Sequence, residues 1–140
     1  MNCVSRVSPP QMIRHLQQLS YISYPYEWSF SQLQDAALLT LRIQKLALRH
    51  GMTLKDASAY NVQFHRGRPL LVDTLSFTAR RDGEPWAAYR QFCQHFLAPL
   101  ALMAYRDVRL GALLRTSIDG VALDLAADTN LSRFVVNDPG

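Results

Sequence analysis

The sequence predicts a mostly helical α+β domain with one small β-hairpin. Three observations carry this prediction: a long run with helical spacing of apolar residues over 32–50, two short apolar runs around a glycine turn near residue 67, and a second helical run from residue 86. A chain of 140 residues can bury one hydrophobic core. An apolar fraction of 49% and a charged fraction of 19% are ordinary for a globular domain, so the whole chain is not expected to be disordered.

Residues 1–28 are predicted to form a separate N-terminal segment. Pro9 and Pro10 end any early element, and residues 11–19 have the apolar spacing of a short helix. Residues 21–28 are dense in aromatic side chains and are interrupted by Pro25. We expect them to form an extended segment that packs into the core, with an aromatic sugar-binding platform as the weaker alternative.

The first long helix is predicted from Gln32 to His50, because this run is rich in good helix formers. Ser29 or Ser31 is placed to cap its start, and Gly51 stands where a helix commonly ends. Apolar residues at helical spacing predict a buried stripe, and further leucines would widen it until much of the helix is covered. The stripe is Ala36, Leu39, Ile43, Leu46 and Ala47, widened by Leu38 and Leu41.

The hairpin is predicted over about residues 62–73, after an aperiodic stretch at 52–61. Alternating residues at 62–64 and an apolar run at 70–72 flank a turn centred on Gly67. Two short strands around a glycine turn form the only strand pair that the sequence indicates.

The second half of the chain is predicted to be helical. Apolar residues three or four apart over 86–97 indicate an amphipathic helix that ends or kinks at Pro99, and residues 107–114 indicate a short third helix. Residues 126–140 are weakly patterned and are predicted to fray. The predicted main module therefore covers residues 29–125.

Composition argues against several classes of function. The net charge is +4, and the basic residues are spread along the sequence, with only Arg80 and Arg81 adjacent. This distribution argues against a nucleic-acid-binding protein, which usually concentrates its Lys and Arg on one face. Cys3 and Cys93 have no metal-ligand spacing. No signal-peptide pattern opens the sequence, and no apolar run reaches the ~20 residues of a membrane span. We therefore expect a cytoplasmic protein without a membrane partner.

Three polar residues have the arrangement that phosphoryl transfer needs. Asp56 and Asn61 lie just before the first hairpin strand, and Asp73 closes the second strand. In such a set one carboxylate orients the attacking hydroxyl, while an amide and a second carboxylate hold Mg²⁺ against the phosphates. The simpler alternative is that all three stabilise turns through their own backbone. Lys55 is a weaker candidate for a phosphate contact, since a loop lysine is usually solvated.

The order of helix, Asp-x4-Asn, hairpin and Asp resembles the catalytic-loop region of protein kinases and aminoglycoside-type phosphotransferases. This resemblance implies a partial kinase-like larger lobe, with Asp56 as the base, Asn61 and Asp73 as Mg²⁺ ligands, and ATP as the donor. The sequence departs from the pattern around both aspartates and has no Gly-rich nucleotide loop. Because fewer than 30 residues precede the first long helix, we expect the nucleotide-binding lobe to be missing and another protein domain to cover its place.

Three stretches carry a closer resemblance: Ser23–Phe30, Leu54–Phe64 and Trp86–Phe96. They are similar to bacterial SAM-dependent methyltransferase-family proteins of the nodulation protein NoeA type, over roughly residues 20–125. The resemblance implies kinship with the region N-terminal to the methyltransferase domain. Methyl transfer by this chain is not expected, because it has neither a Gly-rich loop after a strand nor an acidic residue placed to bind the ribose.

Two hypotheses about function follow. The first is a truncated, non-catalytic kinase-like module that acts by interaction. The alternative is a minimal Mg²⁺-dependent phosphotransferase that uses Asp56, Asn61 and Asp73 with ATP. The sequence leaves open whether the chain is an enzyme.

Overall fold

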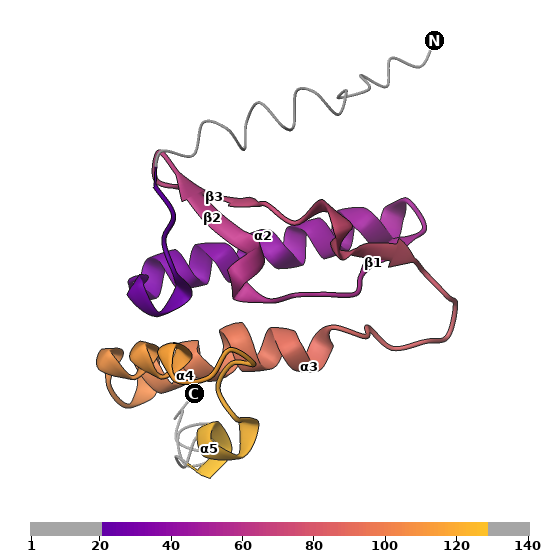
Figure 1. Ribbon diagram of the computed structural model, residues 1–140. Helices are drawn as coiled ribbons and strands as arrows, with labels where there is room; N and C mark the ends of the chain where they lie inside the picture. The colour runs from indigo at the N-terminus through magenta and orange to yellow at the C-terminus, as the bar shows by residue number, and fades with distance from the viewer. Residues whose placement is uncertain (1–20, 129–140) are drawn as a thin grey trace, which may run out of the picture.

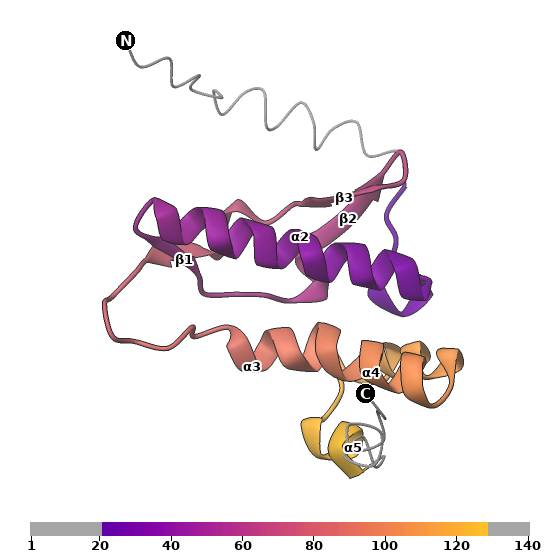
Figure 2. The ribbon, with the colours of Figure 1, turned by 180° about the vertical axis from the view of Figure 1, so that it is seen from behind.

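The structure is a computed structural model that describes residues 21–128. Figures 1 and 2 show the long helix α2 with two small sheets along one side of it, and the helical segment from α3 to α4 running alongside this layer. The predicted mostly helical α+β class is confirmed. The predicted helix at 11–19 and residues 129–140 of the predicted tail lie outside the described residues.

Helix α2 (Phe30–Arg49) begins at a capping box. The Ser29 hydroxyl accepts a hydrogen bond from the Gln32 N–H at 3.3 Å, and the Gln32 side chain accepts one from the Ser29 N–H at 2.9 Å. Gly51 follows the helix with φ +71°, a left-handed conformation that glycine adopts without strain. The predicted cap at Ser29 and the predicted stop at Gly51 are thus confirmed.

The buried face of α2 differs from the predicted stripe. Leu46 is 54% exposed, and Leu38 and Leu41 are also exposed, so the prediction that much of the helix is covered is wrong. Ala36 and Ala47 of the predicted stripe are buried, and the rest of the buried face is Leu33 together with small and polar side chains, which let the strands approach closely. Its buried residues are Leu33, Ala36, Ala37, Thr40, Gln44 and Ala47.

Two antiparallel strand pairs are present in the described part of the chain. The predicted hairpin is confirmed as β2 (Val62–His65) and β3 (Arg68–Leu71), joined by a turn in which Arg66 and Gly67 both have positive φ. The pair of β1 (Met52–Leu54) with β4 (Phe77–Ala79) was not predicted. Strands of three residues are too short to show an alternating pattern.

The second helical segment continues through Pro99. Helix α3 (Tyr89–Phe92) passes into a π-helical turn, η4 (Cys93–Leu97), and then into α4 (Ala98–Tyr105). In the π register the Ala98 N–H bonds the Cys93 carbonyl, five residues back. The next carbonyl, on Gln94, would face the N–H that Pro99 lacks, and it accepts a hydrogen bond from the Val121 N–H at 2.8 Å instead.

The C-terminal part packs back onto this turn. The predicted third helix is present as a 3-10 helix, η5 (Val108–Arg115), capped by the Asp107 side chain. Gly120 has φ +89°, and a Cβ atom there would lie 2.6 Å from the Gln94 carbonyl oxygen, so only glycine fits. Helix α5 (Leu123–Asp128) was not predicted and buries Ala126.

The N-terminal aromatic segment packs into the core only in its second half, through Tyr26 and Trp28, whereas Tyr21 and Tyr24 are exposed. A short 3-10 helix, η1 (Pro25–Glu27), interrupts the predicted extended path. Trp28 is buried, packs edge-on against Phe64 at 5.1 Å between ring centres, and donates from its indole nitrogen to the Ser23 hydroxyl. Within residues 21–128, no helix has both the length and the apolar character needed to cross a membrane.

Candidate functional site

The loop over residues 55–61 follows β1 and is held by side chains of the second helical segment. Gln91 accepts a hydrogen bond from the Ala57 N–H at 2.7 Å, and Nδ1 of His95 accepts one from the Ala59 N–H at 3.2 Å. Both acceptors are more than thirty residues away along the chain. The predicted candidate loop is therefore shaped by tertiary contacts as well as by its own turn.

His95 is a neutral acceptor in this arrangement. Its side chain is 1% exposed, and burial lowers its pKa below the ordinary value of 6.5, while the nearby carboxylates of Asp56 and Asp119 partly oppose the shift. The Tyr60 ring lies edge-on to the imidazole at 6.2 Å between ring centres. A neutral imidazole can accept from Ala59 only if Nδ1 carries no proton, so the environment fixes the tautomer.

Asp56 lies at the start of this loop, and its carboxylate oxygen accepts a hydrogen bond from the Ser58 N–H at 2.9 Å. This is an Asx turn, the turn-stabilising alternative that the sequence left open. The neighbouring Lys55 is exposed and donates its backbone N–H to the Ser76 carbonyl at 2.8 Å. Its predicted phosphate contact stays a prediction.

Asn61 and Asp73 meet at a residue that the sequence did not single out, Ser76. The Asn61 amide donates to the Ser76 hydroxyl at 3.2 Å, and that hydroxyl donates to one carboxylate oxygen of Asp73 at 2.9 Å. The other oxygen of Asp73 accepts from the Leu75 N–H at 2.8 Å and caps the 3-10 turn η3 (Thr74–Ser76). Ser76 is 1% exposed, while Asn61 and Asp73 are half-buried, so this chain of hydrogen bonds is partly buried.

The buried polar side chains of this region have hydrogen-bond partners within the protein. Between residues 21 and 128, no buried side-chain nitrogen or oxygen is left without a hydrogen-bond partner. In the same range no group of three or more His, Cys, Asp or Glu side chains is arranged to hold a metal ion. The proposed roles of Asp56 as a base and of Asn61 and Asp73 as Mg²⁺ ligands are predictions that these contacts do not decide.

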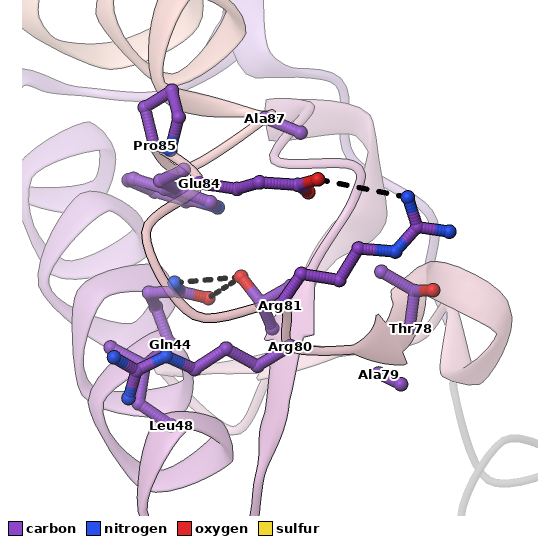
Figure 3. Close-up of a pocket in the computed structure, with 11 residues that line it drawn as sticks. Gln44, Leu48, Thr78, Ala79, Arg80, Arg81, Glu84, Pro85 and Ala87 are labelled. Carbon is purple, nitrogen blue, oxygen red and sulfur yellow. Dashed lines mark hydrogen bonds and ion pairs between the residues drawn. The ribbon is translucent and has the colours of Figure 1, made fainter.

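A pocket of about 380 Å³ lies elsewhere, at the opposite end of the β1–β4 sheet. Figure 3 shows it between the C-terminal half of α2, the end of β4 and the loop over 80–87. Its described lining includes Gln44, Arg80, Arg81 and Trp86 but none of the predicted site residues. Sequence reasoning missed this pocket, and the adjacent arginines are the one local signal that could have pointed to it.

Comparison with curated proteins identifies a relative. The chain is 46% identical over 103 residues to nodulation protein NoeA of Rhizobium meliloti (strain 1021), which is 74% of this chain and 22% of NoeA. The chain is thus related to NoeA and spans less than a quarter of that protein's length. No family model matches the sequence, and no solved structure matches it.

Proposed function

We propose that this chain is a non-catalytic, kinase-like module of a NoeA-type protein and that it acts by contact with another protein domain. The proposed module is related to the region ahead of the methyltransferase domain in SAM-dependent methyltransferase-family proteins. The supporting observation is the partly buried hydrogen-bond chain from Asn61 through Ser76 to Asp73.

That chain uses the groups that a phosphotransferase would turn toward Mg²⁺. Both carboxylate oxygens of Asp73 accept hydrogen bonds from the turn that follows β3. Each oxygen keeps a second lone pair, so a magnesium ion could bind only from the directions that these two bonds leave open and with near-ideal octahedral geometry. In the proposed module Asn61, Ser76 and Asp73 instead connect the hairpin to the start of β4.

The outer face of α2 supplies a contact surface for another domain. Exposed side chains recur there at spacings of four, three, four and three residues, the pattern of a seam between two helices. Three of the five are leucines, and one lysine interrupts them, which fits an apolar helical partner with an acidic residue. The seam consists of Gln34, Leu38, Leu41, Lys45 and Leu48.

A thermal unfolding scan with and without excess Mg²⁺–ATP tests the proposal. We expect one cooperative transition at the same temperature in both conditions, for the natural chain and for Asp73→Ala. A ligand at ~100 times its dissociation constant raises the free energy of unfolding by roughly 2.7 kcal/mol, so binding would be visible. A rise with ATP that Asp73→Ala abolishes would overturn the non-catalytic assignment.

Light scattering tests the contact surface. We expect concentration-dependent self-association of the natural chain and a monomer for the double variant Leu38→Glu/Leu41→Glu, because the seam would otherwise be open to water. The control is Leu75→Glu/Ile118→Glu, which changes two leucine-sized side chains at 79% and 75% exposure outside α2. A natural chain that is monomeric at all concentrations would count against the seam.

The second candidate is the minimal Mg²⁺-dependent phosphotransferase. One observation favours it: Asn61 and Asp73, an amide and a carboxylate, lie on the two sides of one hydroxyl group. This candidate requires phosphoryl transfer from ATP that stops when Asp56→Asn removes the base and when Asp73→Asn removes a metal ligand. Turnover that survives both substitutions would eliminate it.

A further inference from the structure

We propose that the pocket between α2, the β1–β4 sheet and the loop over 80–87 binds a small organic anion, a carboxylate or phosphate ester carried on a flat apolar group. This site is separate from the Asp56, Asn61 and Asp73 region, and the proposal does not depend on the proposed function. Its volume of about 380 Å³ lies in the range of small-molecule sites.

The floor of the pocket is rigid. Gln44 is 7% exposed, and its amide donates to the Thr53 hydroxyl at 3.0 Å while its carbonyl oxygen accepts from the Leu54 N–H at 2.8 Å. These bonds fix the helix against the strand, and Figure 3 marks hydrogen bonds of the Gln44 side chain with dashed lines. A ligand would therefore enter a preformed shape, which reduces the ordering that binding requires.

One wall is flat and apolar. The Trp86 indole nitrogen donates to the Leu54 carbonyl at 2.8 Å, so the ring is held in one orientation. Its polar end is already satisfied, and the rest of the indole, together with Pro85 and Leu48, offers an apolar lining. Such a wall suits a planar group, because aromatic rings stack or pack edge-on with a gain beyond that of buried area.

The rim carries the charge that selects an anion. Arg80 and Arg81 line the pocket with Glu84 as the one acidic lining residue, a net charge of +1 for these three. The arginines pair only loosely within the loop, at 3.7 Å to Asp82 and 3.6 Å to Glu84, with exposed partners. Pairs of this kind contribute little, so a carboxylate or phosphate can replace them and accept both arms of a guanidinium.

In Figure 3 the two arginines extend in different directions, Arg80 toward Leu48 of α2 and Arg81 toward Glu84. Because Arg80 and Arg81 line the rim and Trp86 forms the apolar wall, the anionic group is expected at one of the two guanidinium groups and the flat group against Trp86. This order predicts that both parts of the ligand are needed: the anion gives charge recognition, and the ring gives contact area.

The test is a titration of the chain followed by NMR at the Trp86 indole N–H and the Arg80 and Arg81 side-chain N–H signals. The probes are phenyl phosphate, benzoate, inorganic phosphate and neutral benzyl alcohol, each up to about 10 mM, a range that detects millimolar affinity. We expect phenyl phosphate or benzoate to shift these signals saturably, and the tighter of the two identifies the acid group. Inorganic phosphate and benzyl alcohol should each bind at least about tenfold more weakly.

The matched variants are Arg80→Gln/Arg81→Gln and, as a control, Arg66→Gln/Arg68→Gln in the exposed hairpin turn. We expect the first to weaken binding at least about tenfold and the second to leave it unchanged. An unchanged signal pattern for buried Trp28 verifies that each variant is folded. Four outcomes each overturn the proposal: no saturable shift, equal binding of benzyl alcohol, equal binding of inorganic phosphate, or equal loss in both variants.

Discussion

Two loops leave the β1–β4 sheet at its opposite ends, and they use their polar groups in opposite ways. The loop over 55–61 follows Leu54, and distant side chains and the Ser76 carbonyl accept its backbone N–H groups. The loop over 80–87 follows Ala79, and its charged side chains pair only with each other, at the surface. The polar groups of the first loop are held by distant parts of the chain. In the second loop Trp86 is held in the same way, but the charged side chains pair only weakly at the surface and can exchange these partners for a ligand.

The comparison shows that a catalytic-looking pattern and an open site need not coincide. Asn61 and Asp73, two of the three candidate phosphotransferase residues, are joined to each other through Ser76, and Asp56 accepts from the Ser58 N–H within its own turn. The charged side chains that could meet a ligand lie instead in the loop over 80–87, whose sequence shows no motif beyond the adjacent Arg80 and Arg81. Four measurements test this difference between the two loops.

The largest expected effect follows from His95→Leu. This substitution leaves the buried Ala59 N–H without an acceptor, and we expect the free energy of unfolding to fall by ~2–3 kcal/mol. Denaturant unfolding measures it, with His50→Leu at an exposed position as the control, expected within about 0.5 kcal/mol of the natural chain. Equal values for both variants would show that the loop over 55–61 is not fixed by this contact.

Ser76→Ala is expected to lower the free energy of unfolding by ~1–2 kcal/mol, because it removes the hydroxyl that joins Asn61 to Asp73. Thr78→Ala, two residues on and exposed, should change it by less than about 0.5 kcal/mol. If Ser76→Ala were neutral, the hydrogen-bond chain would not be structural, and the phosphotransferase candidate would gain.

Trp86→Phe keeps an aromatic ring but removes the hydrogen bond to the Leu54 carbonyl. We expect a loss of about 1 kcal/mol or less, since this is a single contact of a partly buried group. The same unfolding experiment measures it. A loss as large as that of His95→Leu would contradict the contrast, because the loop over 80–87 would then be fixed as firmly as the other.

The smallest expected effect is a pH dependence. Burial lowers the pKa of folded His95 below 6.5, so the unfolded chain binds more protons between the folded pKa and 6.5. Stability from this residue is therefore complete above pH 6.5 and falls as the pH decreases through the folded pKa. Unfolding measured over this window should show a shallower slope for His95→Gln, which stays neutral and keeps an acceptor. Identical slopes would mean that His95 does not titrate differently on folding.

Local signals account for what the sequence could predict of the fold. The Ser29–Gln32 capping box and the Gly67 turn each depend on residues that are close together in the sequence. The start of α2 and the turn of the hairpin could therefore be predicted. The β1–β4 pair joins Met52 to Ala79, and strands of three residues carry no period of their own. The prediction placed Ala36 and Ala47 correctly but misjudged the rest of the buried face of α2, because apolar spacing alone does not say that polar side chains such as Thr40 and Gln44 are buried while Leu46 is exposed.

In the candidate site, too, residues in a local sequence pattern could be predicted, and residues that act through distant contacts could not. Asp56, Asn61 and Asp73 stand out because their order along the chain resembles a known loop. Gln91 and His95 accept hydrogen bonds from that loop across the fold. A local sequence pattern cannot predict such a distant contact. The open pocket likewise combines three distant segments, which only the folded chain brings together.

The π-helical turn η4 has a consequence for how this helical segment tolerates change in length. A π turn is a one-residue insertion into an α-helix, and each α-helical residue advances by about 100° around the axis. In a regular helix, one extra residue would turn α4 by about 100° relative to α3, which presents Gln91. The wider π turn holds the extra residue within itself, so the two helices keep their alignment. Deleting one residue within 93–97 is therefore expected to restore a regular helix and to keep both the Gln91 contact to the loop and the packing of α4.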